Sequence, residues 1–232
     1  MTASATNRSD KRTRAVTSGT GATRARIIEA AVTCILERGL YRATSNEIAR
    51  CAGLTWGAIQ RQFGSREALM FAVYEDEWSR LLETQREARL DGDTVEARIR
   101  SLYELLTSYY GRPAAFVGTQ IAVELRKDPQ TSRATLETME RMADESRKLA
   151  PPLMRQVFAG NDLDPTIAHF VYFSIRDFNI GRHVEAVTAP DEMVRRRLCN
   201  LSREEDLLIS MLAATVLSNG RTARSVRGRK AP

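Results

Sequence analysis

The sequence predicts an all-α protein, with a small N-terminal helical domain followed by a larger helical bundle. Three observations support that prediction. Apolar residues recur at three- and four-residue spacing along much of the 232-residue chain. Gly, Pro and Asp cluster at short intervals between those segments, as expected for turns between helices. Ser, Thr or Asp stands at the start of several segments, where it can cap the free N–H groups of a helix.

The first and fourth predicted helices frame the N-terminal domain. Residues 23–38 place apolar side chains on one helical face, and Gly39 follows as a C-cap. Ser65 can cap the fourth helix, whose apolar positions continue to about residue 90. That helix would link the two halves of the chain without a flexible tether.

Two short helices are predicted between them, separated by only a few residues around Gly53. Thr44 or Ser45 can cap the first, and Thr55 can cap the second, which runs towards Phe63. Two helices joined by a short turn that contains glycine form a helix-turn-helix, which places its second helix in the major groove of DNA. This segment is the strongest indication of function in the sequence.

The later segments predict the helical bundle. Asp93 or Thr94 can cap its first helix, and Ser202 can cap its last, which ends near residue 218. Pro151 and Pro152 are expected to stop or kink the helix that precedes them. The expected breaks lie at residues 91–93, 111–113, 128–129, 151–152, 160–165 and 187–202.

Charge is distributed unevenly along the chain, whose net charge is +6. Residues 1–26 carry +5 and residues 221–232 another +5, so the body between them is mildly acidic at −4. Basic ends on an acidic body are typical of a protein that binds an anionic polymer at particular places. Both ends are poor in apolar residues, and we predict disorder at 1–22 and 220–232. The C-terminal tail has a second interpretation, that it only keeps the chain soluble.

Several classes of protein are not expected. No run of about 18 uninterrupted apolar residues occurs, which argues against a membrane-spanning helix, and the N-terminus lacks the apolar core of a secretory signal. Cys34, Cys51 and Cys199 share no metal-ligand spacing, and His169 and His183 have no ligand-type neighbours. We therefore expect reduced thiols, no metal, no cofactor and a cytoplasmic location.

The N-terminal third resembles the tetracycline-repressor (TetR) family of transcription regulators, in motifs whose order and spacing are specific. The resemblance covers about residues 23–75 and implies a helix-turn-helix domain there, with a regulatory and dimerisation bundle at 76–219. It also implies a homodimer that binds double-stranded DNA at a palindromic operator. The rest of the chain resembles the family only in being helical and of suitable length. The matching elements are the apolar first helix, Gly39-Leu40-Tyr41, Ala43-Thr44, Ile48-Ala49, Ala52-Gly53, Gly57-Ala58-Ile59 with Phe63, and Ser65-Arg66-Glu67-Ala68-Leu69.

The second short helix carries the residues that we expect to read DNA. Gln60 can pair with both N6 and N7 of adenine, and apolar or Thr groups can contact the thymine methyl. The small residues Gly57 and Ala58 let the helix backbone approach the groove. Helix N-termini and arginines can bind phosphates. From the residues and the resemblance together, the candidate DNA-contacting positions are Arg24, Thr44, Ser45, Asn46, Thr55, Trp56, Gly57, Ala58, Gln60, Arg61, Gln62 and Arg66.

Three of these positions depart from the family pattern. Relatives often have Tyr where Gln60 stands, Tyr or His where Gln62 stands and Lys where Trp56 stands, and those residues mostly contact phosphate. The departures indicate more base reading and less contact with the DNA backbone. Alternatives remain open, because Trp56 can serve in packing, the two glutamines can be solvated surface, and Arg61 can pair with an acid on the first helix.

Aromatic residues gather in the C-terminal part, where a helical bundle can enclose an apolar ligand, although core packing explains any single one better. Polar residues within apolar segments add anchors, because buried polar groups need partners. We expect a small-molecule effector to bind there. The predicted pocket residues are Trp78, Tyr103, Phe116, Gln120, Met142, Phe170, Phe173 and Asp177.

The final helix is apolar over more than one stripe, and its small residues would let a partner helix approach closely. The dimer implied by the resemblance would then be isologous, with two recognition helices. The predicted interface residues are Leu208, Met211, Leu212, Ala214 and Thr215.

Together these features favour a non-enzymatic DNA-binding regulator, namely a repressor that a small, largely apolar ligand releases. An activator, or a regulator without an inducer, fits the same residues. A helical enzyme is a more distant alternative, because no nucleophile–base pair, metal cluster or phosphate loop is visible. A third hypothesis is a protein that binds a membrane or another partner through its basic tails.

Overall fold

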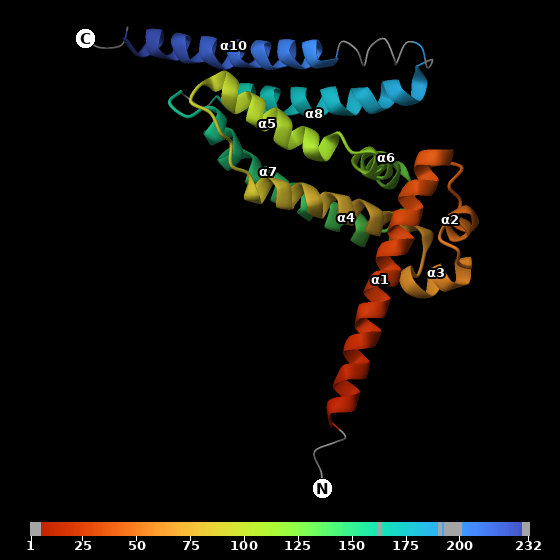
Figure 1. The fold of residues 1–232 in the computed structure, drawn as a ribbon. Coiled ribbons are helices and arrows are strands. Elements are labelled where there is room, and N and C mark those ends of the chain that lie inside the picture. The colour runs from red at the N-terminus through yellow and green to blue at the C-terminus, as the bar shows by residue number, and fades with distance from the viewer. Residues whose placement is uncertain (1–5, 162–163, 190–191, 193–200, 229–232) are drawn as a thin grey trace. The chain divides into compact units, whose positions relative to one another are not determined.

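The computed structural model describes residues 6–161, 164–189, 192 and 201–228, and within these ranges every regular element is a helix (Figure 1). The predicted all-α class is therefore confirmed. In chain order the helices are α1 (Thr6–Arg38), α2 (Ser45–Cys51), α3 (Trp56–Phe63), α4 (Arg66–Glu87), α5 (Val95–Tyr110), α6 (Pro113–Lys127), α7 (Arg133–Val157), α8 (Pro165–Thr188) and α10 (Leu201–Gly228).

The chain forms two compact units. The first comprises Met1–Glu77 and Val117–Thr135, and the second comprises Trp78–Phe116 and Leu136–Pro232. Helices α4 and α6 each contribute residues to both units. The division expected from sequence, at residue 75, placed all of Val117–Thr135 in the C-terminal domain.

A hydrogen-bonded cluster around Glu67 explains why the segment after α6 belongs to the first unit. Glu67 Oε1 accepts hydrogen bonds from the Ser132 hydroxyl at 2.7 Å and the Thr135 hydroxyl at 2.6 Å. These bonds, Thr135 first, lower the pKa of the Glu67 carboxyl and keep it ionised. This contact joins residues more than sixty positions apart, so periodicity along the sequence could not predict it.

Apolar side chains on α1, α2 and α3 form the core of the first unit. Ile27, Ala31 and Ile35 lie on one face of α1 and are buried, as are Ile48 on α2 and Ile59 on α3. The predicted apolar stripe is buried at Ile28, Ala31 and Ile35, whereas Leu36 is 47% exposed. Burial of these side chains holds the two short helices beside α1, because a helix of seven or eight residues is too short to be stable alone.

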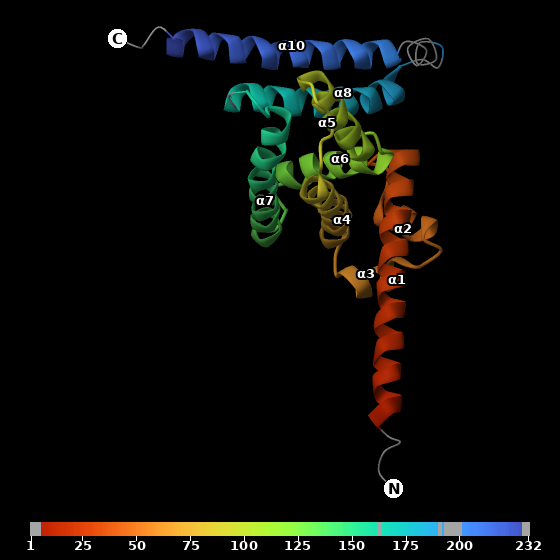
Figure 2. The same ribbon diagram turned by 60° about the vertical axis from the view of Figure 1, so that its left-hand side comes forward.

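The core of the second unit is built from α5, α8, α10 and the ends of α4 and α7. Ile99, Leu106, Val171, Ile175 and Ile209 are fully buried within it. Figures 1 and 2 both show α8 and α10 running side by side, with α5 against them. One of the two predicted caps, Thr94, accepts a hydrogen bond from Ala97 N, and Asp164, in a segment predicted only as a break, caps α8.

Helices extend further than the sequence predicted. Residues 6–22 belong to α1 and α10 continues to Gly228, although both ends were expected to be disordered. Neither stretch contains proline, which would interrupt a helix. Pro151 and Pro152 lie inside α7, where the buried side chains that follow them continue the helix to Val157.

Candidate DNA-binding surface and ligand pocket

Helices α2 and α3 form the turn-linked pair predicted from sequence. Thr44 accepts a hydrogen bond from Glu47 N at 3.4 Å, and Thr55 accepts one from Ala58 N at 3.3 Å, so each is the N-cap of its helix. Gly53 has a φ of 64°, in the left-handed region that glycine adopts readily. The turn and the two caps therefore position the start of α3.

One face of α3 packs inward and the other is open to solvent. Ile59 is fully buried, whereas the side chains of Gln60, Arg61 and Gln62 are exposed and make no hydrogen bond to any described residue. A Cβ atom at Gly57 would meet no atom within 4 Å, so another surface can approach the backbone there. DNA binding by these outward side chains would therefore break no hydrogen bond with the described residues.

The other candidate DNA-contacting residues on α2 and α3 also reach the surface. The exposed positions are Thr44, Asn46, Thr55, Gly57, Gln60, Arg61 and Gln62, and the half-buried positions are Ser45, Trp56 and Ala58. Half-burial leaves both proposed roles of Trp56 open. Arg61 has no ion pair with the described residues, so its alternative pairing with an acid on α1 is not observed.

Two arginines assigned to DNA contact make internal contacts. Arg66 Nη1 donates a hydrogen bond to the carbonyl oxygen of Ala43 at 2.6 Å, and burial of the guanidinium lowers its pKa. The structure therefore shows Arg66 as a clamp on the loop before α2, and its contact with phosphate stays a prediction. Arg24 lies 3.6 Å from the carboxylate of Glu75 and 5.7 Å from the ring centroid of Phe63.

The two described thiols also lie in the first unit. Cys34 is buried and Cys51 is partly buried, and neither forms a disulfide. Burial, with a contribution from the Cys51 thiol, raises the pKa of Cys34 to about 11. Cys34 is therefore protonated at neutral pH and packs as a small apolar residue.

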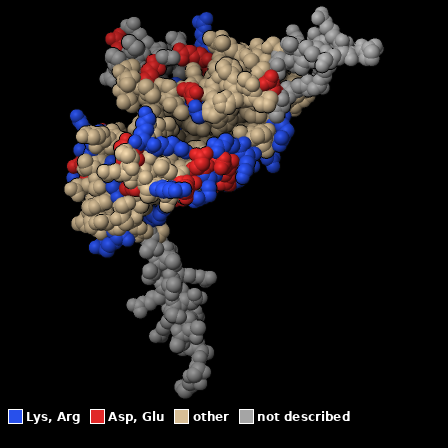
Figure 3. Space-filling view, turned by 180° about the vertical axis from the view of Figure 1, so that it is seen from behind, with Lys and Arg blue, Asp and Glu red and all other residues tan. Residues whose placement is uncertain are grey.

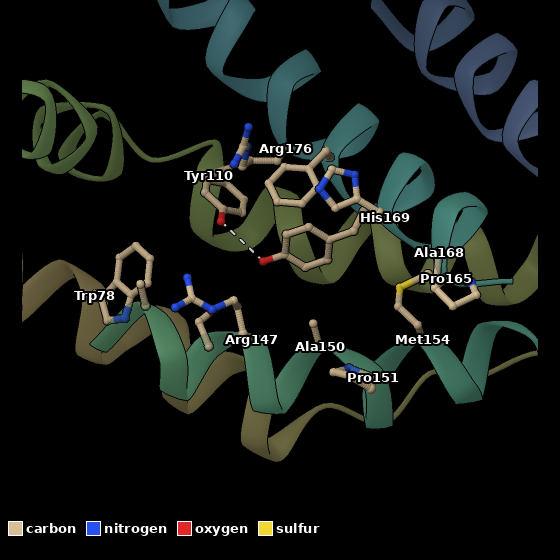
Figure 4. Close-up of a pocket in the computed structure, with 14 residues that line it drawn as sticks. Trp78, Tyr110, Arg147, Ala150, Pro151, Met154, Pro165, Ala168, His169 and Arg176 are labelled. Atoms are coloured by element: carbon tan, nitrogen blue, oxygen red, sulfur yellow. Dashed lines mark hydrogen bonds between the residues drawn. The ribbon is translucent and has the colours of Figure 1, made fainter. Parts of the chain in front are cut away.

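The second unit contains a cavity of about 600 Å³ (Figure 4). Residues of α4, α5, α7 and α8 form its walls, and most of the lining is apolar. Its lining residues are Trp78, Tyr110, Ala143, Ser146, Arg147, Ala150, Pro151, Met154, Pro165, Ala168, His169, Tyr172, Phe173 and Arg176.

A chain of hydrogen bonds borders this cavity. The buried Gln85 donates from Nε2 to the Tyr172 hydroxyl at 2.7 Å, and its Oε1 accepts from the Ser146 hydroxyl at 3.3 Å. The hydroxyls of Tyr172 and Tyr110 lie 3.3 Å apart. Burial raises the pKa of both phenols, while the positive charge of Arg176 acts in the opposite direction. Both phenols therefore remain protonated at neutral pH and can donate hydrogen bonds.

The structure brings two of the predicted pocket residues, Trp78 and Phe173, to this cavity. Trp78 donates from Nε1 to the carbonyl oxygen of Met142 at 3.1 Å, which fixes the indole ring. Met142 supplies that carbonyl but does not line the cavity, and Gln120 belongs to the first unit.

The remaining predicted pocket residues lie elsewhere in the second unit. Phe170 is 52% exposed and does not line the cavity. Asp177 is also exposed and outside the lining, and it forms an ion pair with Arg176 at 2.7 Å. Tyr103 packs in the core, and Phe116 stacks on the imidazole of His183.

Sequence reasoning missed several polar residues at the cavity, among them Gln85, Tyr110, Tyr172 and Arg176. A signal was present, because His169, Tyr172 and Arg176 recur at three- and four-residue spacing and so share one face of α8. Because residues 166–186 are mostly apolar, the sequence favoured core packing for this helix over a ligand site.

Among the described residues, no group of three or more His, Cys, Asp or Glu side chains could hold a metal ion. No helix in the described part of the chain is long and apolar enough to span a bilayer. In Figure 3, Lys and Arg side chains are interleaved with Asp and Glu across the face shown, so that face carries no uniform basic patch.

Helix α10 exposes an apolar face, rotated from the predicted one. Leu207 and Met211 are each 60% exposed, and Ala214 is also exposed. Leu212 is only 1% exposed and belongs to the core, so it cannot serve on an outer surface without disrupting the protomer. Thr215 is partly buried, and its hydroxyl donates to the carbonyl oxygen of Met211. Leu208 packs partly buried against the core.

Residues 27–73 match the family of bacterial regulatory proteins named the tetR family. Uncharacterised helix-turn-helix-type transcriptional regulators of Mycobacterium tuberculosis and Mycobacterium bovis are each 32% identical over 77 residues, which are 33% of this chain and 39% of each relative. The chain thus spans about 39% of the length of the curated relatives that it matches.

Solved structures resemble the chain over a greater length. A regulatory protein of the tetR family from Rhodococcus RHA1 has a TM-score of 0.59 at 19% identity, covering 82% of this chain and 96% of that one. The regulator FadR from Bacillus subtilis, solved in complex with stearoyl-CoA, has a TM-score of 0.53 at 17% identity, covering 84% and 95%. At these identities the likeness shows a shared fold.

Proposed function

We propose that this protein is a homodimeric repressor of the TetR family. The proposal starts from the match of residues 27–73 to that family of bacterial regulatory proteins. In this proposal the dimer binds a palindromic operator in cytoplasmic DNA, and a small molecule in the second unit releases it. The family assignment supports DNA binding. Repression, dimerisation and release are inferred from the surfaces described above.

The open face of α3 is the observation on which the DNA-binding proposal rests. Gln60 and Gln62 are exposed amide side chains with no internal partner, on a helix whose start is fixed by Thr55. Amides in this position can pair with base edges in the major groove. Gly57 leaves room for the backbone to come close to the duplex.

Selection of bound duplexes from a random pool tests this proposal directly. We expect two inverted half-sites whose centres lie about one helical turn, or a multiple of it, apart. Affinity for the selected duplex should fall steeply with salt concentration, because phosphate contacts release counterions. Recovery of no enriched sequence, together with an affinity that does not depend on salt, would refute DNA recognition by α3.

The proposed dimer rests on apolar side chains that α10 and α8 leave exposed. Leu207 and Met211 on α10, and Val184 and Val187 on α8, expose 46–76% of their surface in the single chain. Several large apolar side chains exposed on two neighbouring helices are typical of an interface. We expect Met211→Glu to convert a dimer into a monomer in analytical ultracentrifugation, whereas Ser79→Glu, the same added charge at an exposed position of α4, should leave the dimer intact.

Release by an effector is proposed because one continuous helix carries residues of both functional regions. Trp78 and Gln85 of α4 border the cavity, and Arg66 at the start of α4 clamps the loop before α2. A ligand that binds better to one position of α4 than to another would shift the DNA-binding state. The stearoyl-CoA complex of FadR supports the idea that this fold can hold a ligand with a long apolar chain. The test is whether a cavity ligand lowers operator affinity.

A further inference from the structure

We propose that the effector is an apolar molecule with a single carboxylate, which Arg176 and a phenolic hydroxyl of the Tyr110–Tyr172 pair bind at one end of the cavity. This inference rests on the proposed function, because it specifies the ligand of the same cavity. It follows from the lengthwise arrangement of polar and apolar groups, from the unused donors at one end, and from the local charge balance.

The cavity has a polar end and an apolar end. Its α7 wall runs from Ala143 to Met154, eleven helical steps of about 1.5 Å, so the cavity is roughly 16 Å long. In Figure 4, Arg176, Tyr110 and Trp78 lie towards one end, while Met154 and Pro165 lie towards the other. An elongated molecule with one polar terminus matches this arrangement, and a molecule that is polar throughout does not.

Arg176 presents a partly shielded cation at the polar end. Its side chain is 33% exposed, and its Cζ lies 4.0 Å from the ring centroid of Phe173. Nε and Nη2 contact the carboxylate of Asp177, which leaves Nη1 with no hydrogen bond to a described residue. The stacked ring holds the guanidinium in place and excludes water from one of its faces, so an anion can bind at the unused edge.

The tyrosine pair supplies a second unused donor beside that cation. The Tyr172 oxygen accepts from Gln85, and the contact between the two hydroxyls uses only one of their protons. Whichever tyrosine donates, one phenolic O–H remains without an acceptor among the described residues. A carboxylate has two oxygens, which suits one bond to this O–H and one to the guanidinium.

The local charges disfavour a ligand with more than one negative charge. Arg147, the other arginine of the lining, already pairs with Glu140 and Asp144, so it offers little net positive charge. Arg176 is itself partly neutralised by Asp177. These three nearby carboxylates repel a dianionic phosphate about twice as strongly as a single carboxylate, which can bind the Nη1 edge of Arg176 that Asp177 leaves unused.

Matched acid and alcohol pairs test the proposal on the full chain by isothermal titration calorimetry. The probes are decanoate with 1-decanol, and 4-phenylbutyrate with 4-phenylbutan-1-ol. We expect the protein to bind each acid at least about tenfold more tightly than its alcohol, since a charge-assisted hydrogen bond exceeds a neutral one by roughly that much. Arg176→Gln should reduce this preference to below about threefold without weakening alcohol binding.

Arg155→Gln is the matched control, because Arg155 is an exposed arginine of α7 outside the lining and its loss changes the net charge equally. It should keep the acid preference. Tyr110→Phe and Tyr172→Phe each remove one hydroxyl, and each should reduce the preference by a smaller factor than Arg176→Gln does.

Four results would overturn the assignment. These are equal affinity for acid and alcohol, an acid preference that survives Arg176→Gln, tighter binding of decyl phosphate than of decanoate, and no binding of any probe. Failure of the proposed function has a different signature. If the acids bind selectively but leave the affinity for the selected duplex unchanged, the ligand class stands and release by this ligand does not.

Discussion

The outward face of α3 and the cavity of the second unit use polar side chains in opposite ways. Gln60 and Gln62 on α3 are exposed and bond to no described residue. Gln85 beside the cavity is buried and bonds to Tyr172 and Ser146. A side chain of the first kind can be replaced without disturbing the fold, whereas one of the second kind contributes to stability as well as to any ligand site.

This difference means that function and stability should separate on α3 and should be coupled at the cavity. Mutations of the exposed side chains Gln60 and Gln62 on α3 should change DNA affinity and leave stability nearly unchanged. Mutations around Gln85 should change the free energy of unfolding first, so that a ligand defect there has to be separated from a folding defect. The following changes test that distinction.

The largest effect is expected for the double change Trp56→Ala with Gln60→Ala. Affinity for the selected duplex should fall about 100-fold or more, since each good base contact contributes roughly 1–3 kcal/mol. Fluorescence anisotropy measures the loss, and circular dichroism should show a folded protein. Gln130→Ala, at an exposed glutamine of the same unit, should bind as before. Unchanged affinity in the double variant would mean that α3 does not read DNA through these residues.

Gln85→Ala should lower the free energy of unfolding by roughly 2–3 kcal/mol, because it removes buried hydrogen bonds and leaves a void. Urea denaturation measures this change. Glu83→Ala, at an exposed neighbour on α4, should change stability by less than about 0.5 kcal/mol. If Gln85→Ala is as stable as the wild-type chain, the cavity network does not support the fold and the contrast with α3 is lost.

Arg66 and Arg61 should give opposite results when each is changed to Gln. Arg66→Gln breaks the bond to the Ala43 carbonyl, so it should destabilise the fold by about 1–3 kcal/mol and leave the salt slope of DNA binding unchanged. Arg61→Gln removes an exposed cation, so it should leave stability unchanged and reduce that slope by about 1. If Arg66→Gln instead reduces the salt slope and Arg61→Gln does not, Arg66 is the phosphate anchor.

The smallest effect is expected for Gly57→Ala. A Cβ atom has open space there, and alanine is favoured over glycine in a helix, so the fold should gain roughly 0.5–1 kcal/mol. DNA affinity should nevertheless fall severalfold, because the methyl group keeps the backbone from the groove. Gly181→Ala on α8, where a Cβ atom also meets nothing, should stabilise the chain similarly and leave DNA affinity unchanged.

Local signals made the first unit predictable. Caps at Thr44 and Thr55, the turn at Gly53 and the buried Ile59 all depend on residues within a few positions of one another, and all were expected from the sequence. The role of Arg66 could not be predicted in this way, because its partner lies 23 residues earlier in the loop before α2.

The second unit was less predictable because periodicity gives the faces of a helix but not the neighbours of each face. Leu212 and Met211 are adjacent and both apolar, yet one is in the core and the other is exposed. Phe170 and Phe173 lie on the same helix, yet only Phe173 reaches the cavity.

By itself the sequence determined the helical class, the helix-turn-helix and the residues on its outward face, because caps, glycine turns and apolar periodicity act over a few residues. Only the tertiary structure decided which residues enclose the cavity, which donors remain unused there and which face of α10 is open. Those features depend on contacts between helices far apart in the chain, such as the bonds of Gln85 to Tyr172 and Ser146.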